Sequence, residues 1–185
     1  ARWPGVMESD LLRAGHRVRV IEDCLNGRRT VWDDPFKPGR NGLSGLEQRI
    51  EVNSPLALVI LMLGTNDFQA THHNNASQSA QGIAALVLAI RRAPIEPGMP
   101  CPPIMIVSPP PPVAASGSME QKFAGARERS AGLSDAHRQT AAELECHFFD
   151  ASLMTRVSSL DGVHLDADQH QVLGREIARP VGALL

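Results

Sequence analysis

The chain has 185 residues, 43% of them hydrophobic, and a formal net charge of −2 at pH 7. This length and composition suit one α/β domain with a core of its own, which we expect to span residues 1–185. Because Lys and Arg are dispersed and the balance is weakly acidic, we expect neither a nucleic acid nor a membrane as partner.

The first part of the chain alternates helical and strand-like stretches. Residues 3–11 carry apolar side chains at helical spacing, and Gly15 is a stop signal. Residues 18–22 have the pattern of a strand, and prolines and glycines at 35–45 predict an irregular loop. Residues 56–63 are apolar on both faces, which is typical of a central strand in a parallel sheet.

The second part continues this alternation. Residues 77–92 predict a helix with one apolar side, and residues 104–107 predict a second buried strand. A helical region at 127–145, a short strand at 147–150 and a closing helix at 168–185 follow. The order of these elements indicates a three-layer α/β/α fold with a mainly parallel sheet.

Three polar segments lie at the ends of predicted strands or in the loops that follow. They are Asn-Gly at residues 26–27, Gly-Thr-Asn-Asp at 64–67 and Asp-Gly-Val-His at 161–164. In open α/β sheets, ligands bind outside the carboxyl ends of the strands. We therefore expect these distant segments to meet in one site.

The residue types in these segments suit ester hydrolysis by a nucleophile. Asp161 and His164 are three positions apart, so one loop can hold a carboxylate against an imidazole base. Asn66 offers a side-chain amide, and Gly27 offers a backbone N–H that a carbonyl oxygen can approach closely. Together they supply a base, its orienting partner and two oxyanion donors.

The same segments resemble the SGNH/GDSL hydrolase family. Residues 25–30 (Leu-Asn-Gly-Arg-Arg-Thr), 64–67 and 161–164 are similar to its second, third and fifth sequence blocks. The stretch from residues 20–23 through 33–35 and 40–42 resembles its arylesterase and acyltransferase branch, as do residues 107–111. The resemblance covers essentially the whole chain and implies a flavodoxin-like fold.

The resemblance also implies an activity. It implies a serine ester hydrolase that acts on small acyl esters through an acyl-enzyme, with alcohols or peroxide competing with water in an acyl transfer. His164 is then the general base and acid, Asp161 orients it, and Gly27 and Asn66 hold the oxyanion. No cofactor and no metal are implied, and the partner is a small ester.

The chain departs from the family pattern in three places. Cys24 stands where the branch usually has Gly, and we interpret it as a filler of core space. Arg29 stands where the branch usually has Thr. The first block, Gly-Asp-Ser followed by Leu or Ile, occurs nowhere in the 185 residues. The nucleophilic serine is therefore not among them, and we expect these residues alone not to turn over esters.

In the family, the first block forms a central strand of the sheet. Without that strand, residues 18–22 lack a neighbour and their backbone groups stay unpaired, so we expect these residues to fold badly alone. We expect the serine segment to lie upstream of these residues or to be cleaved from them. The intact mass of the purified protein tests this expectation.

Two other interpretations remain. A catalytically dead or truncated SGNH domain would retain a ligand-binding pocket. A metal site is suggested by Asp161, His164, Asp166, Asp168 and His170. Their spacing fits no standard zinc pattern, and Asp166 or Asp168 is typical of a helix N-cap.

Several other residues near these segments invite a functional interpretation. Trp32, Phe68 and Val163 adjoin them and are candidates for an acyl or alcohol pocket, with ordinary packing as the alternative. Asp67 is expected to hold the turn at 64–67 by bonds to backbone N–H groups. We expect most of the remaining histidines to be solvated, namely His16, His72, His73, His137 and His147.

Four residues are replacement nucleophiles in principle. Three are Ser44, Ser54 and Ser108, none of which lies in a sharp strand–turn–helix context between glycines. The fourth is Cys24, which lies near the second block but is expected to be buried.

The cysteines and the hydropathy bear on localisation. Cys24, Cys101 and Cys146 are odd in number and far apart, which argues against a disulfide framework and a structural zinc site. No apolar run approaches the ~20 residues that span a bilayer. Free cysteines favour the cytoplasm. Relatives on this branch often associate, so a homo-oligomer is expected, with the loop at 32–46 as its candidate surface.

Overall fold

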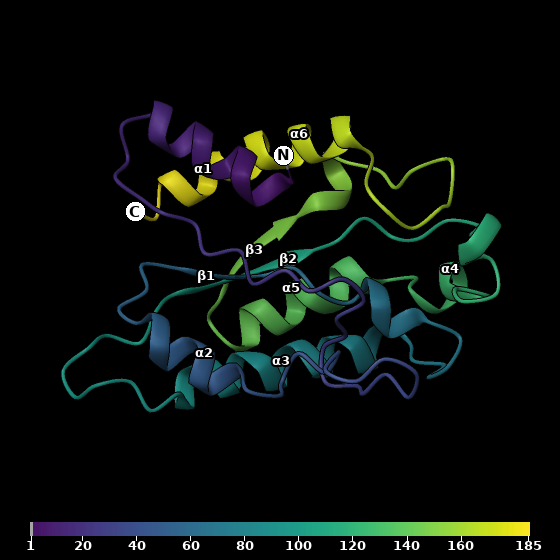
Figure 1. The fold of residues 1–185 in the computed structure, drawn as a ribbon, viewed down its shortest axis with the longest axis horizontal. Helices are drawn as coiled ribbons and strands as arrows, with labels where there is room; N and C mark the ends of the chain where they lie inside the picture. The colour runs from purple at the N-terminus through teal and green to yellow at the C-terminus, as the bar shows by residue number, and fades with distance from the viewer. Residues whose placement is uncertain (1) are drawn as a thin grey trace.

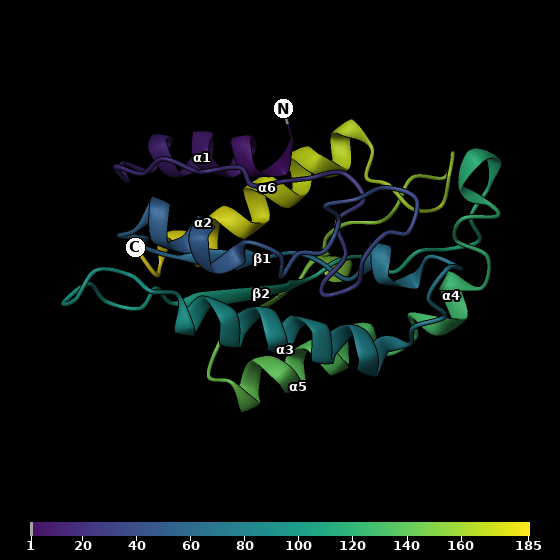
Figure 2. The ribbon, with the colours of Figure 1, turned by 60° about the horizontal axis from the view of Figure 1, so that its bottom comes forward.

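The computed structural model describes residues 2–185 and shows three layers (Figure 1). Helices α1 (Trp3–Arg13) and α6 (Ala167–Gly182) cover one face of the sheet. On the other face, α3 (Ala76–Arg92) and α5 (Leu133–Glu143) lie side by side, as Figure 2 also shows, and α2 (Leu46–Asn53) packs against α3. The expected α/β/α fold is confirmed.

The sheet has three parallel strands in the order β1-β2-β3. They are β1 (Val59–Leu61), β2 (Ile104–Ser108) and β3 (His147–Asp150). The remaining helical elements are short, namely α4 (Ala126–Arg129) and the 3-10 turns η1 (Thr65–Phe68), η2 (Gly117–Met119) and η3 (Ala151–Leu153).

Strand β2 is buried along its whole length and divides the core in two. Because successive side chains of a strand point to opposite faces, its residues alternate between two apolar clusters. Ile104 and Ile106 pack with side chains of α2 and α3. Met105 and Val107 pack with side chains of α1 and α6.

Most predicted elements are present with boundaries close to those expected. Helices α1, α3 and α6 and strands β2 and β3 lie where the sequence patterns place them. The helical region at 127–145 is divided into α4 and α5, because Gly132 precedes α5 with a left-handed φ of 79°. Helix α2 was not predicted. Among the described residues, no helix has both the length and the hydrophobicity needed to cross a membrane.

The structure differs from the prediction at two expected strands, residues 18–22 and residues 56–63. The prediction of a strand at 18–22 is incorrect, because within residues 2–185 the stretch 17–24 makes no backbone-to-backbone hydrogen bond. Of the stretch 56–63, only the three residues of β1 pair with a neighbour. Val59 and Ile60 are half-buried rather than buried on both faces. β1 therefore has β2 on one side and an open edge on the other.

Helices α1 and α6 approach each other at a glycine. Gly174 is buried, and a Cβ built on it would lie 2.5 Å from Cβ of Val6 and 2.7 Å from the carbonyl oxygen of Trp3. Real Cβ atoms do not tolerate such distances, so the two helices pack this closely because residue 174 has no side chain.

We predict that Gly174→Ala destabilises the protein. Although alanine favours a helix, the added methyl group must push α1 away, and overpacking of this kind costs about 1–3 kcal/mol. Urea unfolding measures the loss. The control is the exposed neighbour Arg175→Ala, with an expected change of less than about 0.5 kcal/mol. A more stable Gly174→Ala protein would contradict the packing argument.

Candidate active site

Asp161 and His164 form a hydrogen-bonded pair on the loop before α6. Oδ2 of Asp161 lies 2.6 Å from Nδ1 of His164. Oδ1 of Asp161 accepts from the backbone N–H groups of Val163 at 2.9 Å and His164 at 3.0 Å. Gly162 makes this turn possible, with φ of 75° and a position where a Cβ would lie 2.6 Å from the Ala114 carbonyl oxygen.

The electrostatics of this pair set the tautomer of the imidazole. Burial raises the pKa of the Asp161 carboxyl, but the hydrogen bonds from His164 and Val163 outweigh it and lower the pKa below its ordinary value. The carboxylate is therefore ionised near neutral pH and favours a proton on Nδ1 of His164. Nε2 is then an acceptor, on a side chain that is 54% exposed.

Asn66 lies in η1, directly after β1. Its Nδ2 donates to the carbonyl oxygen of Arg28 at 3.2 Å, a contact between positions 38 residues apart. Gly27, with φ of 81°, immediately precedes Arg28. The predicted meeting of the segments at 26–27 and 64–67 is therefore present in the structure.

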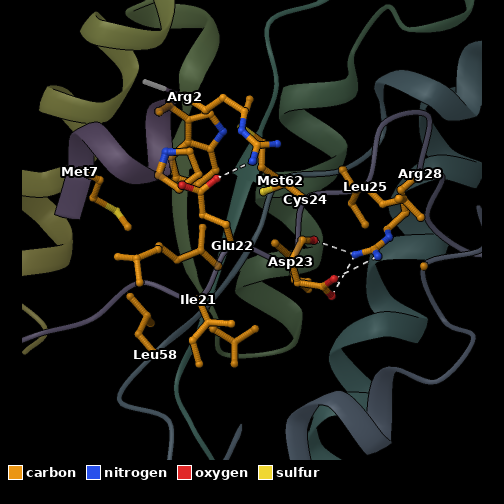
Figure 3. Close-up of a pocket in the computed structure, with 18 of the residues that line it drawn as sticks. Arg2, Met7, Ile21, Glu22, Asp23, Cys24, Leu25, Arg28, Leu58 and Met62 are labelled. Atoms are coloured by element: carbon orange, nitrogen blue, oxygen red, sulfur yellow. Dashed lines mark hydrogen bonds and ion pairs between the residues drawn. The ribbon is translucent and has the colours of Figure 1, made fainter. Parts of the chain in front are cut away.

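A groove of about 1000 Å³ runs along the open edge of β1 (Figure 3). Residues 18–25 line one side of the groove and residues 56–63 line the other. Ile21 of the first stretch and Leu58 of the second lie near each other in Figure 3. Polar residues of all three predicted segments line the same groove, namely Asn26, Gly27, Asn66 and His164. The groove is thus largely apolar along β1 and carries the candidate base and oxyanion donors.

The three predicted pocket residues differ in their positions. Val163 lines the groove and is itself 6% exposed. Phe68 is completely buried, in an apolar cluster that also includes Val163. Trp32 lies outside the groove lining and packs against His72, with ring centroids 6.1 Å apart. Of the three predicted pocket residues, Val163 alone is therefore placed to contact a molecule in the groove.

The replacement nucleophiles have other environments. Ser54 donates to the Ile50 carbonyl oxygen at 2.8 Å, and Ser108 is completely buried. Cys24 is exposed and lines the groove, so the interpretation as a core filler is wrong. Partial burial raises the pKa of the Cys24 thiol, which disfavours the reactive thiolate. Throughout residues 2–185, the only hydrogen bond of the His164 imidazole is to Asp161.

The metal site suggested by residues 161–170 is not supported by a cluster of ligands. Within the part of the chain that the structure describes, no three His, Cys, Asp or Glu side chains gather in a metal-binding arrangement. Asp166 occupies the N-cap position of α6, one of the two positions predicted, although its side chain accepts no capping hydrogen bond.

Asp67 anchors the turn that carries Asn66. Its buried carboxylate accepts hydrogen bonds from the backbone N–H of Thr30 at 2.9 Å, from Oγ1 of Thr30 at 2.8 Å and from Oγ of Ser79 at 2.7 Å. Burial raises the pKa of Asp67 against the effect of these donors. The expected structural role is present, but the donors belong to other segments rather than to its own turn.

Two residues near Asn66 were not recognised from the sequence as belonging to the site. Gln69 is 2% exposed, and its Nε2 donates to Oδ1 of Asn66 at 2.9 Å. Arg29 is 1% exposed, donates through Nη2 to Oε1 of Gln69 and forms an ion pair through Nη1 with Oδ2 of Asp34 at 2.8 Å. The only sequence signal was the presence of Arg29 where the branch usually has Thr.

His137 lies in the core, so the prediction that it is solvated is wrong. It is completely buried on the inner face of α5, and a Cβ on Gly64 would lie 3.3 Å from its Cε1. Burial lowers the pKa of His137 to about 4, while the charge of Asp150 acts in the opposite direction. Leu133 and Ala141, four positions before and after His137, are buried on the same face of α5. This spacing of apolar residues is the sequence signal that indicates a buried position for His137.

The chain is similar to known proteins in both sequence and structure. Residues 1–172 match the model of the GDSL-like Lipase/Acylhydrolase family. The inhibitor-bound structure of M. smegmatis aryl esterase is 32% identical, with a TM-score of 0.92, over 100% of this chain and 86% of that one. A carbohydrate acetylesterase family member from Sinorhizobium meliloti is 37% identical, with the same TM-score and coverage. No curated protein gives a significant match.

The buried His137 predicts a pH dependence of stability. Because its folded pKa of about 4 lies below the unfolded value of 6.5, the unfolded chain takes up a proton first as the pH falls. This group therefore stabilises the fold fully above pH 6.5 and loses that contribution between pH 6.5 and about 4.

The measurement is urea unfolding at about pH 7 and about pH 5, where His137 alone accounts for a loss of about 2 kcal/mol. A His137→Leu protein loses less stability over the same interval, by about that amount, because leucine binds no proton. Equal losses in the two proteins would show that His137 is not held neutral.

Proposed function

The chain belongs to the GDSL-like lipase/acylhydrolase family and is a serine ester hydrolase, and we propose that the polar residues of its groove form the catalytic site. The observation that supports this site best is the 2.6 Å contact between Asp161 and His164 on a groove that Asn66 also lines. The contact orients the imidazole so that Nε2 is free to take a proton.

In the proposed mechanism, Nε2 of His164 takes the proton of a serine hydroxyl as its oxygen attacks the ester carbonyl. Asp161 stabilises the imidazolium that forms. The backbone N–H of Gly27 and the amide of Asn66 donate to the oxyanion. When the C–O bond to the leaving group breaks, His164 returns the proton to the departing alcohol. Water, deprotonated by the same imidazole, then attacks the acyl-enzyme, and His164 returns this proton to the serine oxygen as the bond between that oxygen and the acyl group breaks.

We propose that the nucleophilic serine is not one of the hydroxyl groups of residues 2–185, none of which hydrogen-bonds to His164. The groove supports this proposal. It lies between β1 and residues 17–24, which make no backbone-to-backbone hydrogen bond within the described chain. An extended segment in the groove could pair with backbone groups on both sides and bring a serine to His164.

This proposal predicts a difference between two expressed proteins. The complete reading frame is expected to hydrolyse p-nitrophenyl acetate, whereas residues 1–185 expressed alone are expected to show only the background rate. Intact mass and circular dichroism establish which chain is present and whether it is folded. A folded 185-residue protein with full activity would contradict the proposal, and an inactive complete protein would favour a ligand-binding domain without catalysis.

We propose that the substrates are esters with a small acyl group. The supporting observation is the similarity to an aryl esterase and to a carbohydrate acetylesterase family member, because the name of the second specifies an acetyl group, which is a small acyl group. Acyl transfer to an alcohol is a further proposal from the sequence resemblance. It is tested in the same assay by adding an alcohol and measuring the new ester, whose absence would contradict it.

Substitution of the proposed base and its partner gives a quantitative prediction. In the complete protein, His164→Ala is expected to lower kcat by about 10³-fold or more, and Asp161→Asn by a comparable or smaller factor. His147→Ala is the matched control, because this histidine is exposed on β3 and outside the groove lining. Retention of kcat in a folded His164→Ala protein would exclude His164 as the base.

We also propose that the protein works in the cytoplasm. The support is that Cys24, Cys101 and Cys146 are all free, which suits a reducing compartment. Fractionation of the native cells with an antibody tests this, and recovery of the protein outside the cytoplasm would contradict it.

A further inference from the structure

Four polar side chains form a continuous relay that ends at Asn66. Oδ2 of Asp34 lies 2.8 Å from Nη1 of Arg29, and Nη2 of Arg29 donates to Oε1 of Gln69. Nε2 of Gln69 then donates to Oδ1 of Asn66 at 2.9 Å. Arg29 and Gln69 are 1% and 2% exposed, so water does not replace these partners. The contacts between Arg29, Gln69 and Asn66 are therefore made between protein groups.

The direction of the relay follows from the donor at its start. A guanidinium group donates hydrogen bonds and accepts none, so Gln69 must meet Arg29 with its oxygen. The other end of the Gln69 amide is then its NH₂ group, which also only donates. Asn66 must therefore meet Gln69 with Oδ1, and its own NH₂ group lies on the opposite side.

The orientation of the Asn66 amide matters because its two ends have opposite effects on an anion. One N–H of Asn66 is directed at the Arg28 carbonyl oxygen, 3.2 Å away, and the second is left for another acceptor. An amide turned by half a rotation would present Oδ1 instead, which repels an oxyanion. The two orientations have nearly the same shape, so packing alone does not distinguish them.

We propose that Arg29 and Gln69 are positioning residues that fix the Asn66 amide with its NH₂ group toward the oxyanion. This inference rests on the proposed function, because it requires Asn66 to be an oxyanion donor. Neither Arg29 nor Gln69 touches the substrate. They act by ensuring that the amide has its productive orientation before the substrate arrives, which avoids a reorganisation during the reaction.

Asp34 makes a buried arginine possible at the start of the relay. An unpaired guanidinium in the core would be strongly destabilising, and the Asp34 carboxylate neutralises it. Burial raises the pKa of Asp34, but the hydrogen bonds from Arg29 and from the backbone N–H groups of Phe36 and Lys37 lower it below its ordinary value. Asp34 therefore stays charged at neutral pH.

The decisive test is Gln69→Glu in the complete protein. A carboxylate keeps the partner of Arg29 but presents an acceptor to Asn66, so the Asn66 amide turns its NH₂ group toward residue 69. The kcat for p-nitrophenyl acetate is expected to fall about 10²-fold, as after loss of one oxyanion donor, with KM changed less than about twofold. Gln69→Ala is expected to have a smaller effect, because the Arg28 carbonyl still favours the productive orientation.

A double variant, Arg29→Met with Gln69→Lys, is the rescue. The ammonium group only donates, so it meets Oδ1 of Asn66 as Gln69 does. The net charge of the four side chains is unchanged, because one cation replaces another and Asp34 is kept. We expect kcat within about fivefold of the parent, because the Asn66 orientation is kept. If the two residues were merely structural, the opposite order would hold, with the near-isosteric Gln69→Glu harmless and the double replacement damaging.

An Asn66→Ala background separates the two proposals. In a protein that already carries Asn66→Ala, adding Gln69→Glu is expected to cause no further loss of kcat, because the two changes remove the same donor. If Asn66→Ala is damaging and Gln69→Glu is not, the relay is wrong while the catalytic site stands. If Asn66→Ala leaves kcat unchanged, Asn66 is not an oxyanion donor and the relay has no catalytic role, whereas the roles of His164 and Asp161 are decided by their own substitutions. Thermal melting of every variant ensures that the comparison is made between folded proteins.

Discussion

The site depends on the buried carboxylate of Asp67. Its oxygens accept from Thr30 on one segment and from Ser79 on α3, and so join three parts of the chain that are distant in sequence. Each bond matters, because a buried donor or acceptor without a partner costs about 1–3 kcal/mol. The carboxylate thereby holds the turn of Asn66 against the segment that contains Gly27.

The backbone around this carboxylate is shaped to let the segments approach. A Cβ on Gly82 would lie 2.1 Å from Oγ1 of Thr30, so α3 can reach the Thr30 segment only where it has no side chain. A Cβ on Gly64 would lie 3.1 Å from Oγ of Ser79, the hydroxyl that donates to Asp67. Two glycines thus bring α3 close enough for the Asp67 hydrogen bonds.

The sequence predicted what is encoded locally and missed what depends on distant partners. Helix α3 and strand β2 were predicted because the hydrophobic pattern of each is visible in its own consecutive residues. A strand needs a neighbour, so the apolar run at 56–63 is paired only over β1. The pair of Asp161 and His164 was predictable from its spacing. The contact of Asn66 with Arg28 was not, because 38 positions separate the two residues, and neither was the contact of Gln69 with Arg29, which are 40 positions apart.

The two halves of the proposed machinery therefore differ in how they are held. Asp161 and His164 sit on one short turn, in which the carboxylate itself accepts the backbone N–H groups, so the pair is organised locally. Asn66 owes its position to long-range contacts with Arg28 and, through Asp67, with Thr30. Because long-range contacts are lost when segments separate, a loosened segment at residues 25–30 would disturb the oxyanion donors first. The orientation of the base would survive such a change, and acid–base competence alone would then give little catalysis, because the developing charge would lack its preorganised donors.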